Sequence, residues 1–368
     1  MLALSEFDLP SLQSQLVDWG FLPSHAHRLL REFYQTAGRL DLDQLRIGNA
    51  LCSRLRREVA IFQSRIISRH CSTDGTVKLL VGLDRGGTVE TVLMPAYRPD
   101  RAAGCVSSQI GCAMGCDFCA SARGGLVRNL TSGEIVEQFL HLRRECAAQN
   151  RRLRSLVFMG MGEPMHNLEN VIAAILRIAR PSLGNLGFRA ITVSTVGIVP
   201  GIDELADRDL GVHLAVSLHA PDDETRARIV PTARRWRVAD IIAAAKHFAA
   251  KTDRYVTIEY CLLAGVNDSD AQALKLARLL DGFTAHVNLI PYNSIGAGLS
   301  GRIYAKSQSG RMQRFMQILR EHRVVAHFRR IRGDDVSAAC GQLRSRLILA
   351  DDQREWSSTG PQMMTKTC

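Results

Sequence analysis

Cys112-Ala113-Met114-Gly115-Cys116-Asp117-Phe118-Cys119 is the stretch around which the rest of the chain is organised. Its three thiols lie in a short, glycine-containing loop, so their sulfurs can converge on one object. Zinc sites built from four cysteines use two C-x-x-C knuckles, and this loop lacks the second. Ferredoxin clusters are held by four cysteines, so three thiols would leave one iron of a 4Fe–4S cube without a protein ligand. The loop therefore predicts a cluster with an open iron. The alternatives are a zinc site with a distant fourth ligand and redox-inert core cysteines.

Composition limits the classes of protein to consider. The 368 residues, 46% of them hydrophobic, suffice for one large domain and a smaller one. No run approaches the roughly 18 apolar residues of a membrane span, and no signal pattern opens the chain, so we expect a cytoplasmic protein that does not bind membranes. The ten cysteines are then expected to be cluster ligands, catalysts or core residues. A net charge of +11 favours a polyanionic partner.

Residues 1–76 predict a small helical domain. Apolar residues recur there at helical spacing through Leu12, Leu16 and Trp19, and again through Leu29, Leu30 and Phe33. A later segment adds Arg54, Arg56 and Arg57 on the expected polar side. This basic module is interpreted either as an accessory RNA-binding domain or as a scaffold with a charged face.

A change of period marks residues 77–94. Two apolar runs, 77–83 and 88–94, flank Asp84-Arg85-Gly86-Gly87, which predicts a β-hairpin. Glu90 interrupts the second run. Such a glutamate usually faces solvent, whereas a half-buried one could act as a base.

Strands and helices alternate beyond the cysteine loop. Thr131-Ser132-Gly133-Glu134 has the form of a capping box. Expected strands follow at 155–159, 190–194, 212–217, 256–262, 286–290 and 324–328, with helices between them such as 167–179, 239–250 and 271–280. Repeated βα units predict an α/β fold, a partial (β/α) barrel over residues 77–345, with active residues at the carboxyl ends of its strands. The polar residues 346–368 predict a tail.

Several stretches resemble the RlmN/Cfr class of radical-SAM methyltransferases, which methylate an adenine in ribosomal RNA. The similarity covers residues 77–345, and the Ala-Ala-Cys-Gly-Gln-Leu segment at 338–343 is close to unique to this class. The other matching stretches are 89–95, 105–112, the cysteine loop, 160–164, 214–221, 255–269, 287–293 and 332–337. The fold this resemblance implies is the radical-SAM partial barrel.

The resemblance implies two sets of binding residues. Cys112, Cys116 and Cys119 would ligate the 4Fe–4S cluster. S-adenosylmethionine would be held by Gly162, Glu163, Ser194, Ser217, Leu218, His219 and Asn293. The chemistry agrees, because the ammonium group and ribose hydroxyls of S-adenosylmethionine need acceptors, and glycine allows close approach of the backbone.

Three further residues would be catalytic by resemblance. Adenine carbons 2 and 8 are electrophilic, so polar methyl transfer finds no nucleophile there. The class first places a methyl group on a cysteine, here Cys340. A deoxyadenosyl radical from a second S-adenosylmethionine then activates that methyl group for addition to the ring. Cys105 would release the product by forming a Cys105–Cys340 disulfide, and Glu90 would accept the ring proton.

The substrate is less sharply indicated. Gly162-Glu163-Pro164 and His219-Ala220-Pro221 look like the carbon-2 branch, which modifies 23S ribosomal RNA, with transfer RNA as a further substrate class to test. The alternatives are a carbon-8 enzyme of the Cfr type and a non-catalytic iron–sulfur RNA-binding factor. The N-terminal module departs from the usual pattern, and two residues are inserted between Glu90 and Cys105. We expect a monomer that takes electrons from a flavodoxin or ferredoxin.

Three arginine groups are candidates for contacts with RNA phosphates. They are Arg151, Arg152 and Arg154, then Arg234, Arg235 and Arg237, and finally Arg329, Arg330 and Arg332. The alternative for each group is a solvated surface without a partner. At least one of them is expected to bind RNA.

Overall fold

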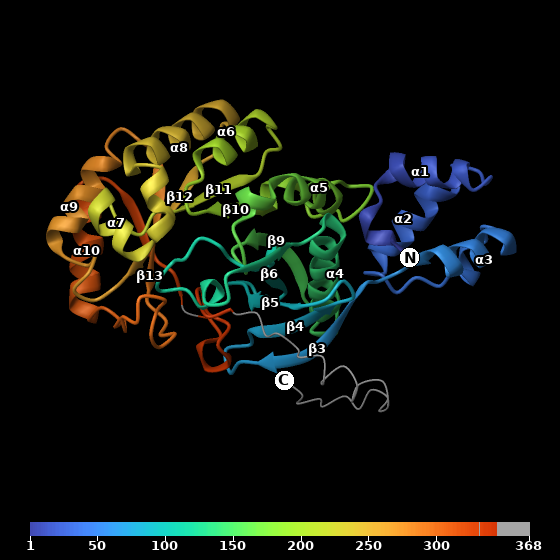
Figure 1. Ribbon diagram of the computed structural model, residues 1–368, viewed down its shortest axis with the longest axis horizontal. Helices are drawn as coiled ribbons and strands as arrows, with labels where there is room; N and C mark the ends of the chain where they lie inside the picture. The colour runs from blue at the N-terminus through green and yellow to red at the C-terminus, as the bar shows by residue number, and fades with distance from the viewer. Residues whose placement is uncertain (331, 344–368) are drawn as a thin grey trace.

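The computed structural model describes residues 1–330 and 332–343 (Figure 1). The expected tail at 346–368 lies outside the described residues. The helices are α1 Leu9–Asp18, α2 His25–Gln35, α3 Asn49–Glu58, α4 Ser132–Ala148, α5 Leu168–Ala179, α6 Val199–Asp207, α7 Asp223–Ile229, α8 Val238–Thr252, α9 Asp270–Leu279 and α10 Ser309–Glu321. The strands are β1 Leu2–Ala3, β2 Val59–Ala60, β3 Ser64–Cys71, β4 Val77–Leu83, β5 Thr88–Pro95, β6 Arg101–Cys105, β7 Gln109–Gly111, β8 Leu126–Asn129, β9 Arg152–Phe158, β10 Ile191–Thr195, β11 His213–Ser217, β12 Val256–Leu262, β13 Ala285–Pro291 and β14 Val325–Phe328.

One large sheet organises the molecule. Within the described residues it has ten strands in the order β14-β13-β12-β11-β10-β9-β6-β5-β4-β3. Strands β6 and β9 to β14 run parallel, and β5, β4 and β3 continue the sheet in antiparallel fashion. Helices α6 to α10 lie on one side of the curved parallel part in Figure 1. The predicted α/β fold of the partial-barrel type is confirmed.

The hairpin and the βα alternation also agree with the sequence. Strands β4 and β5 pair antiparallel around the predicted turn, and β9 to β14 lie within three residues of their expected positions. The sheet starts earlier than expected, however, because β3 at Ser64–Cys71 pairs with β4. This strand lies at the edge of the sheet and has half-exposed and exposed faces, so it carries no apolar alternation that would reveal it.

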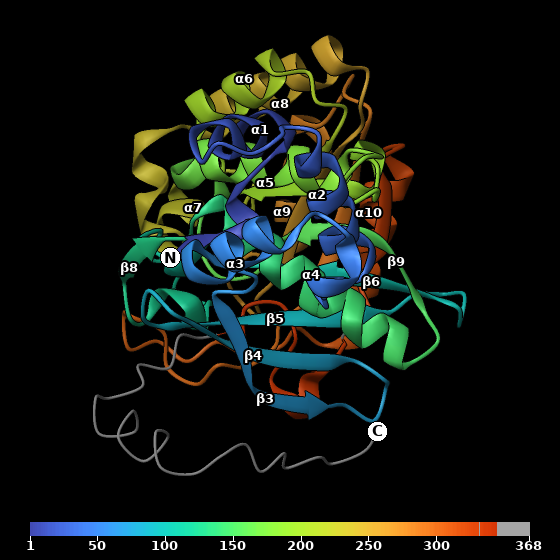
Figure 2. The same ribbon diagram turned by 90° about the vertical axis from the view of Figure 1, so that its right-hand side faces the viewer.

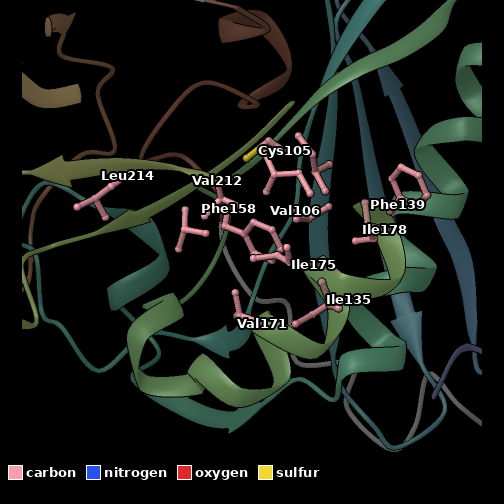
Figure 3. Close-up of a cluster of buried hydrophobic side chains, with 14 of the residues drawn as sticks. Cys105, Val106, Ile135, Phe139, Phe158, Val171, Ile175, Ile178, Val212 and Leu214 are labelled. Carbon is pink, nitrogen blue, oxygen red and sulfur yellow. The ribbon is translucent and has the colours of Figure 1, made fainter. Parts of the chain in front are cut away.

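Helix α4 contributes apolar side chains to the hydrophobic core. Its capping box is formed as predicted: Thr131 Oγ1 accepts from the Glu134 backbone N–H, and the Glu134 carboxylate accepts from Thr131 N–H. Figure 3 shows Ile135 and Phe139 of α4 packed with apolar side chains of α5 and β9. Cys146, expected in the core, is buried.

The N-terminal helices form a separate layer beside α4 and α5 (Figure 2). Leu12, Leu16, Leu29 and Phe33 are buried, as their helical spacing indicated. The buried carboxylate of Glu137 in α4 attaches the N-terminal segment to this helix, because it accepts hydrogen bonds from Ser5 Oγ at 2.9 Å and from Gln63 N at 2.9 Å. Among the helices that the structure describes, none is both long and apolar enough to span a membrane.

Candidate active site

A pocket opens at the carboxyl ends of the parallel strands. It is lined by Cys112, Met114, Cys116, Phe118, Cys119, Ser121, Phe158, Met159, Gly160, Gly162, Glu163, Pro164, Ser194, Thr195, Val196, Ser217, His219, Glu259, Cys261, Ile290, Tyr292, Arg329, Cys340 and Gly341. Nine of the thirteen candidate site residues are in this set. Cys105, Glu90, Leu218 and Asn293 do not line it.

The cysteine loop follows β7 and turns twice. Gly115 adopts a left-handed φ of 67°, which permits a tight turn between Cys112 and Cys116. Cys112 N–H donates to Gly125 O at 2.9 Å, and Cys119 N–H donates to Cys116 O at 3.0 Å. Burial, with the nearby Cys119 and Cys112, raises the pKa of Cys116 well above its usual value. Bound cations would oppose this shift and hold the three thiolates.

Asp117 of the cysteine loop forms hydrogen bonds to the loop between β13 and α10. Its buried carboxylate accepts from Ser300 N at 2.7 Å, Ser300 Oγ at 2.6 Å and Tyr304 Oη at 2.7 Å. These bonds hold the pKa of Asp117 below its usual value although burial opposes them. The loop between β13 and α10 is therefore fixed against the cysteine loop by charge-assisted hydrogen bonds.

Glu163 follows β9 at the start of a short 3-10 helix, Pro164–Asn167. Its carboxylate is buried and accepts from the backbone N–H of Met165 at 3.0 Å and of Val196 at 2.9 Å. Burial raises the pKa of Glu163 to about 7. Gly162 has a φ of 101°, and a Cβ there would lie 2.5 Å from Gln109 Cβ, so only glycine fits.

The ends of β10 and β11 bring two hydroxyls together. Ser194 Oγ and Ser217 Oγ are 3.4 Å apart. Leu218 contributes backbone only: its side chain is buried, and its carbonyl accepts from Arg226 Nε at 3.0 Å. The buried Arg226 was not identified from the sequence, because its position on α7 gives no sign that it reaches the strand ends.

His219 is held in one tautomer. Cys261 N–H donates to its Nδ1 at 3.0 Å, so the ring proton resides on Nε2. Burial lowers the pKa of His219 to about 3, which keeps the ring neutral. The imidazole also packs edge-on against the ring of Phe118 in the cysteine loop, with 4.8 Å between the ring centroids. The backbone of His219 is strained, because its φ of 60° lies in the left-handed region.

The segment that carries Cys340 is anchored to the cysteine loop. Ala120 N–H donates to Gly341 O at 2.7 Å, and Asn293 Nδ2 donates to Cys340 O at 3.3 Å. Ser121 Oγ adds a bond to Leu343 O at 2.5 Å. Cys340 is exposed and lines the pocket, whereas Asn293 is buried behind it. An accessible thiol is thus placed beside the three-cysteine loop.

Cys105 ends β6 beneath this segment. Its thiol is buried, with its side chain drawn at the margin of the apolar cluster in Figure 3. Burial raises the pKa of Cys105 to about 12; nearby Cys340 adds to the rise, and Arg329 opposes it. Both cysteines are free thiols in this structure. The two thiols and Arg329 therefore lie within mutual electrostatic reach.

Arg329 does not face outward with its sequence neighbours. It lines the pocket, donates to Met159 Sδ at 3.2 Å and pairs with Glu259 at 3.4 Å. The nearby Cys340 raises the pKa of Arg329, and Glu259 adds to the effect. Arg329, which follows β14, thus lies in the pocket and not on the open surface with Arg330, and its contact with RNA stays a prediction. Glu259 was likewise missed, although a charge within an apolar strand was a usable signal.

Glu90 is buried rather than solvent-facing. Its carboxylate lies 3.1 Å from the Nζ of Lys78, which is also buried and donates to Ser337 O at 3.2 Å. In the hairpin register Lys78 faces Val92, so Glu90 is its diagonal neighbour on the same face. The lysine therefore connects Glu90 to the segment that carries Cys340.

Replacing Lys78 with methionine should destabilise the protein. Breaking a buried ion pair by removing one of its partners costs about 3–5 kcal/mol. Urea unfolding should show this loss, and the double variant Lys78→Met, Glu90→Met should recover much of it because both members of the pair are then replaced by apolar side chains. A single variant as stable as the parent would contradict the pairing described here.

The donor set fits a cluster and an attached S-adenosylmethionine. Three thiols line one wall of the pocket, while Glu163, Ser194 and Ser217 provide acceptors on the other. Within the described ranges, no three histidine, cysteine or carboxylate side chains are arranged around a single metal-ion position. A cube differs from a single ion in that each cysteine binds a different iron.

Comparisons with known proteins agree with this chemistry. The radical SAM superfamily model matches residues 106–277. A probable dual-specificity RNA methyltransferase RlmN 1 from Opitutus terrae is 53% identical over 344 residues, covering 94% of this chain and 97% of the relative. The dual-specificity RNA methyltransferase RlmN 1 of Myxococcus xanthus is 41% identical, with 93% and 94% covered.

A solved structure shares the whole architecture. The crystal structure of a radical SAM methyltransferase from Sphaerobacter thermophilus superimposes with a TM-score of 0.88 at 41% identity, covering 94% of this chain and 99% of that one. Sequence and fold lead to the same assignment over nearly the full length. The chain belongs to the radical SAM superfamily and, within it, to the RlmN family.

Proposed function

We propose that this enzyme methylates carbon 2 of an adenine in 23S ribosomal RNA through a methyl-cysteine intermediate. The observation that carries the proposal is the placement of Cys340 beside the three-cysteine loop, with Cys105 close behind it. A binding factor needs no such pair of thiols. The relatives are named dual-specificity RNA methyltransferases, which supports more than one RNA substrate, and transfer RNA is the second substrate in this proposal.

Cofactor binding is assigned to three parts of the pocket. Cys112, Cys116 and Cys119 hold the cluster, which when bound supplies the electron that cleaves S-adenosylmethionine. Glu163 and the paired hydroxyls of Ser194 and Ser217 accept from the donor groups of S-adenosylmethionine. Gly162 allows the backbone to approach, and His219 completes the wall. Leu218 and Asn293 support the pocket from behind through their hydrogen bonds to Arg226 and to Cys340 O.

Cys340 and Cys105 have different roles in the transfer of the one-carbon unit. Cys340 carries the one-carbon unit to the adenine, which gives a ring–methylene–sulfur link. The adduct first loses the ring proton and its unpaired electron, which the bound cluster would take back. The Cys105 thiolate then attacks the sulfur of Cys340, and an S–S bond forms as the sulfur–methylene bond breaks. The electron pair remains on the carbon, which becomes the methyl group on protonation. An external reductant restores the two thiols.

Two charged groups assist this chemistry in the proposal. Glu90 receives the proton that leaves the ring carbon, and Lys78 holds its carboxylate in place through an ion pair at 3.1 Å. Arg329 lies near both thiols, and against the rise caused by burial it lowers the pKa of Cys105, which favours the thiolate form of that residue. The chain acts in the cytoplasm as a monomer that receives electrons from a flavodoxin or ferredoxin.

Replacing Arg234, Arg235 and Arg237 together with glutamine should weaken RNA binding. All three are exposed, and Thr232 Oγ1 donates to Met114 O at 2.8 Å, which fixes this segment beside the cysteine loop. Each lost phosphate contact lowers the slope of log affinity against log salt by about 0.7–0.9. Affinity measured over a range of salt concentrations should therefore fall and become less salt-dependent.

The matched control is the triple variant of Arg151, Arg152 and Arg154. These residues lie at the start of β9, at the opposite end of the strand from the pocket. Their replacement should leave the RNA affinity nearly unchanged. The reverse result would move the RNA surface to the other end of the sheet.

Mass mapping of RNA tests the proposed function directly. Ribosomal and transfer RNA from cells with and without the gene should differ by a methyl group on carbon 2 of specific adenines. A methyl group on carbon 8 instead would show the Cfr-type activity. RNA that is identical in the two strains would contradict the methyltransferase assignment.

A further inference from the structure

The surface beside the cysteine loop is unusually apolar. Of the twelve exposed large apolar side chains in the described residues, four lie on two segments that touch this loop: Leu126 at 42%, Val127 at 55%, Leu299 at 52% and Ile303 at 74% exposure. Leu126 and Val127 belong to β8, and the other two to the loop between β13 and α10. Exposed apolar groups gathered in this way mark an interaction surface.

Both segments are attached directly to the cysteine loop. Gly125 O accepts from Cys112 N–H at 2.9 Å, and Leu126 pairs with Gly111, the residue before Cys112. On the other segment, a Cβ at Gly298 would lie 2.2 Å from Asp117 O. The backbones of this segment and of the cysteine loop are therefore in direct contact. The surface therefore lies directly beside the proposed cluster ligands, because Cys112 is hydrogen-bonded to Gly125 and Gly298 packs against Asp117.

The same surface carries an excess of positive charge. Arg123 donates to the carbonyls of Ile295 and Ala297, which bridges the two segments, and no carboxylate among the described residues forms an ion pair with it. Arg302 and Lys306 are also exposed. Residues 112–130 and 294–306 contain one acidic side chain, Asp117, and it is buried. An acidic partner would meet a basic rim around an apolar centre.

We propose that Leu126, Val127, Leu299 and Ile303, with Arg123, Arg302 and Lys306, form the docking face for a small acidic flavoprotein that delivers electrons. The apolar benzenoid edge of its reduced flavin packs on the aliphatic side chains, and its carboxylates meet the basic rim. The flavin loses one electron and the cluster gains it. This inference rests on the proposed function, since only a chain that holds a redox cluster needs a donor.

RNA is the rival occupant of this face. Aliphatic side chains give phosphate groups no hydrogen bonds, whereas they suit the edge of a flavin. The position of the face against Cys112 also shortens the electron path, a property that RNA binding does not require. The observations therefore favour the electron donor.

Charge reversal on the face tests the inference. The test variants are Val127→Glu and Leu299→Glu, and the matched controls are Val325→Glu on β14 and Leu22→Glu in the N-terminal module, both exposed in the parent. A flavodoxin serves as the probe, and its affinity for each holoenzyme is measured by surface plasmon resonance. The test variants should bind about tenfold more weakly, because a like charge is placed in the centre of the interface, and the controls should change less than about twofold.

A chemical reductant separates docking from chemistry. With dithionite, S-adenosylmethionine cleavage and RNA methylation should be the same in all variants, whereas flavodoxin-driven cleavage should fall about tenfold in the two test variants alone. Unchanged flavodoxin affinity in both test variants would overturn the inference. So would lost RNA affinity with unchanged flavodoxin affinity, which would make this an RNA surface. Absence of RNA methylation in the dithionite-driven parent would instead count against the proposed function.

Discussion

Cys105→Ala should accumulate protein covalently attached to RNA, whereas Cys340→Ala should form neither product nor adduct. The first variant still loads the one-carbon unit on Cys340 and transfers it to adenine, but it lacks the thiol that breaks the sulfur–methylene bond. The second has no carrier. A denaturing gel should show a slow-migrating, nuclease-sensitive protein band for Cys105→Ala only, with methylation reduced to background in both variants.

The comparison of the two variants also controls for a loss of stability. A merely destabilising substitution at the buried Cys105 would give less of every species and no adduct. Normal turnover by Cys105→Ala, or a crosslink formed by Cys340→Ala, would reverse the assigned roles. Exposed Cys340 and buried Cys105 should also differ in alkylation by iodoacetamide, with Cys340 reacting first.

Cys116→Ala should remove the cluster and all activity. Two remaining thiols cannot hold three irons of a cube, and Cys116 is the most enclosed of the three cysteines. Anaerobically purified parent protein should be brown with charge-transfer absorption at about 400 nm, and the variant should be colourless with background iron. A matched Cys52→Ala substitution, in the N-terminal core, should keep the colour. A brown Cys116→Ala that still cleaves S-adenosylmethionine would refute the ligand assignment.

Local patterns were readable from the sequence because neighbouring residues determine them. The cysteine loop, the hairpin around Asp84-Arg85-Gly86-Gly87 and the capping box at Thr131 all depend on residues a few positions apart. The barrel followed from the alternation of strands and helices, since parallel strands place their carboxyl ends at one edge. Strand β3 was missed because its exposed face removes the apolar signal.

Pairings across the sheet were not readable, because register decides them. Arg329 and Glu259 lie 70 positions apart and meet only because β12, β13 and β14 are adjacent. Arg226 reaches the Leu218 carbonyl through the angle at which α7 leaves β11, which no local pattern encodes. By contrast, the contact of Lys78 with Glu90 was within reach, since the predicted hairpin already made them diagonal neighbours.

The bonds around Asp117 have a consequence for how the holoenzyme is assembled in the cell. Because the carboxylate is fixed by Ser300 and Tyr304, part of the cysteine loop is held by hydrogen bonds that do not involve its three thiols. Zinc fingers, in contrast, fold only when their ion arrives. The restraint at Asp117 should thus reduce the conformational entropy that the cysteine loop loses when the iron–sulfur assembly machinery inserts a cluster.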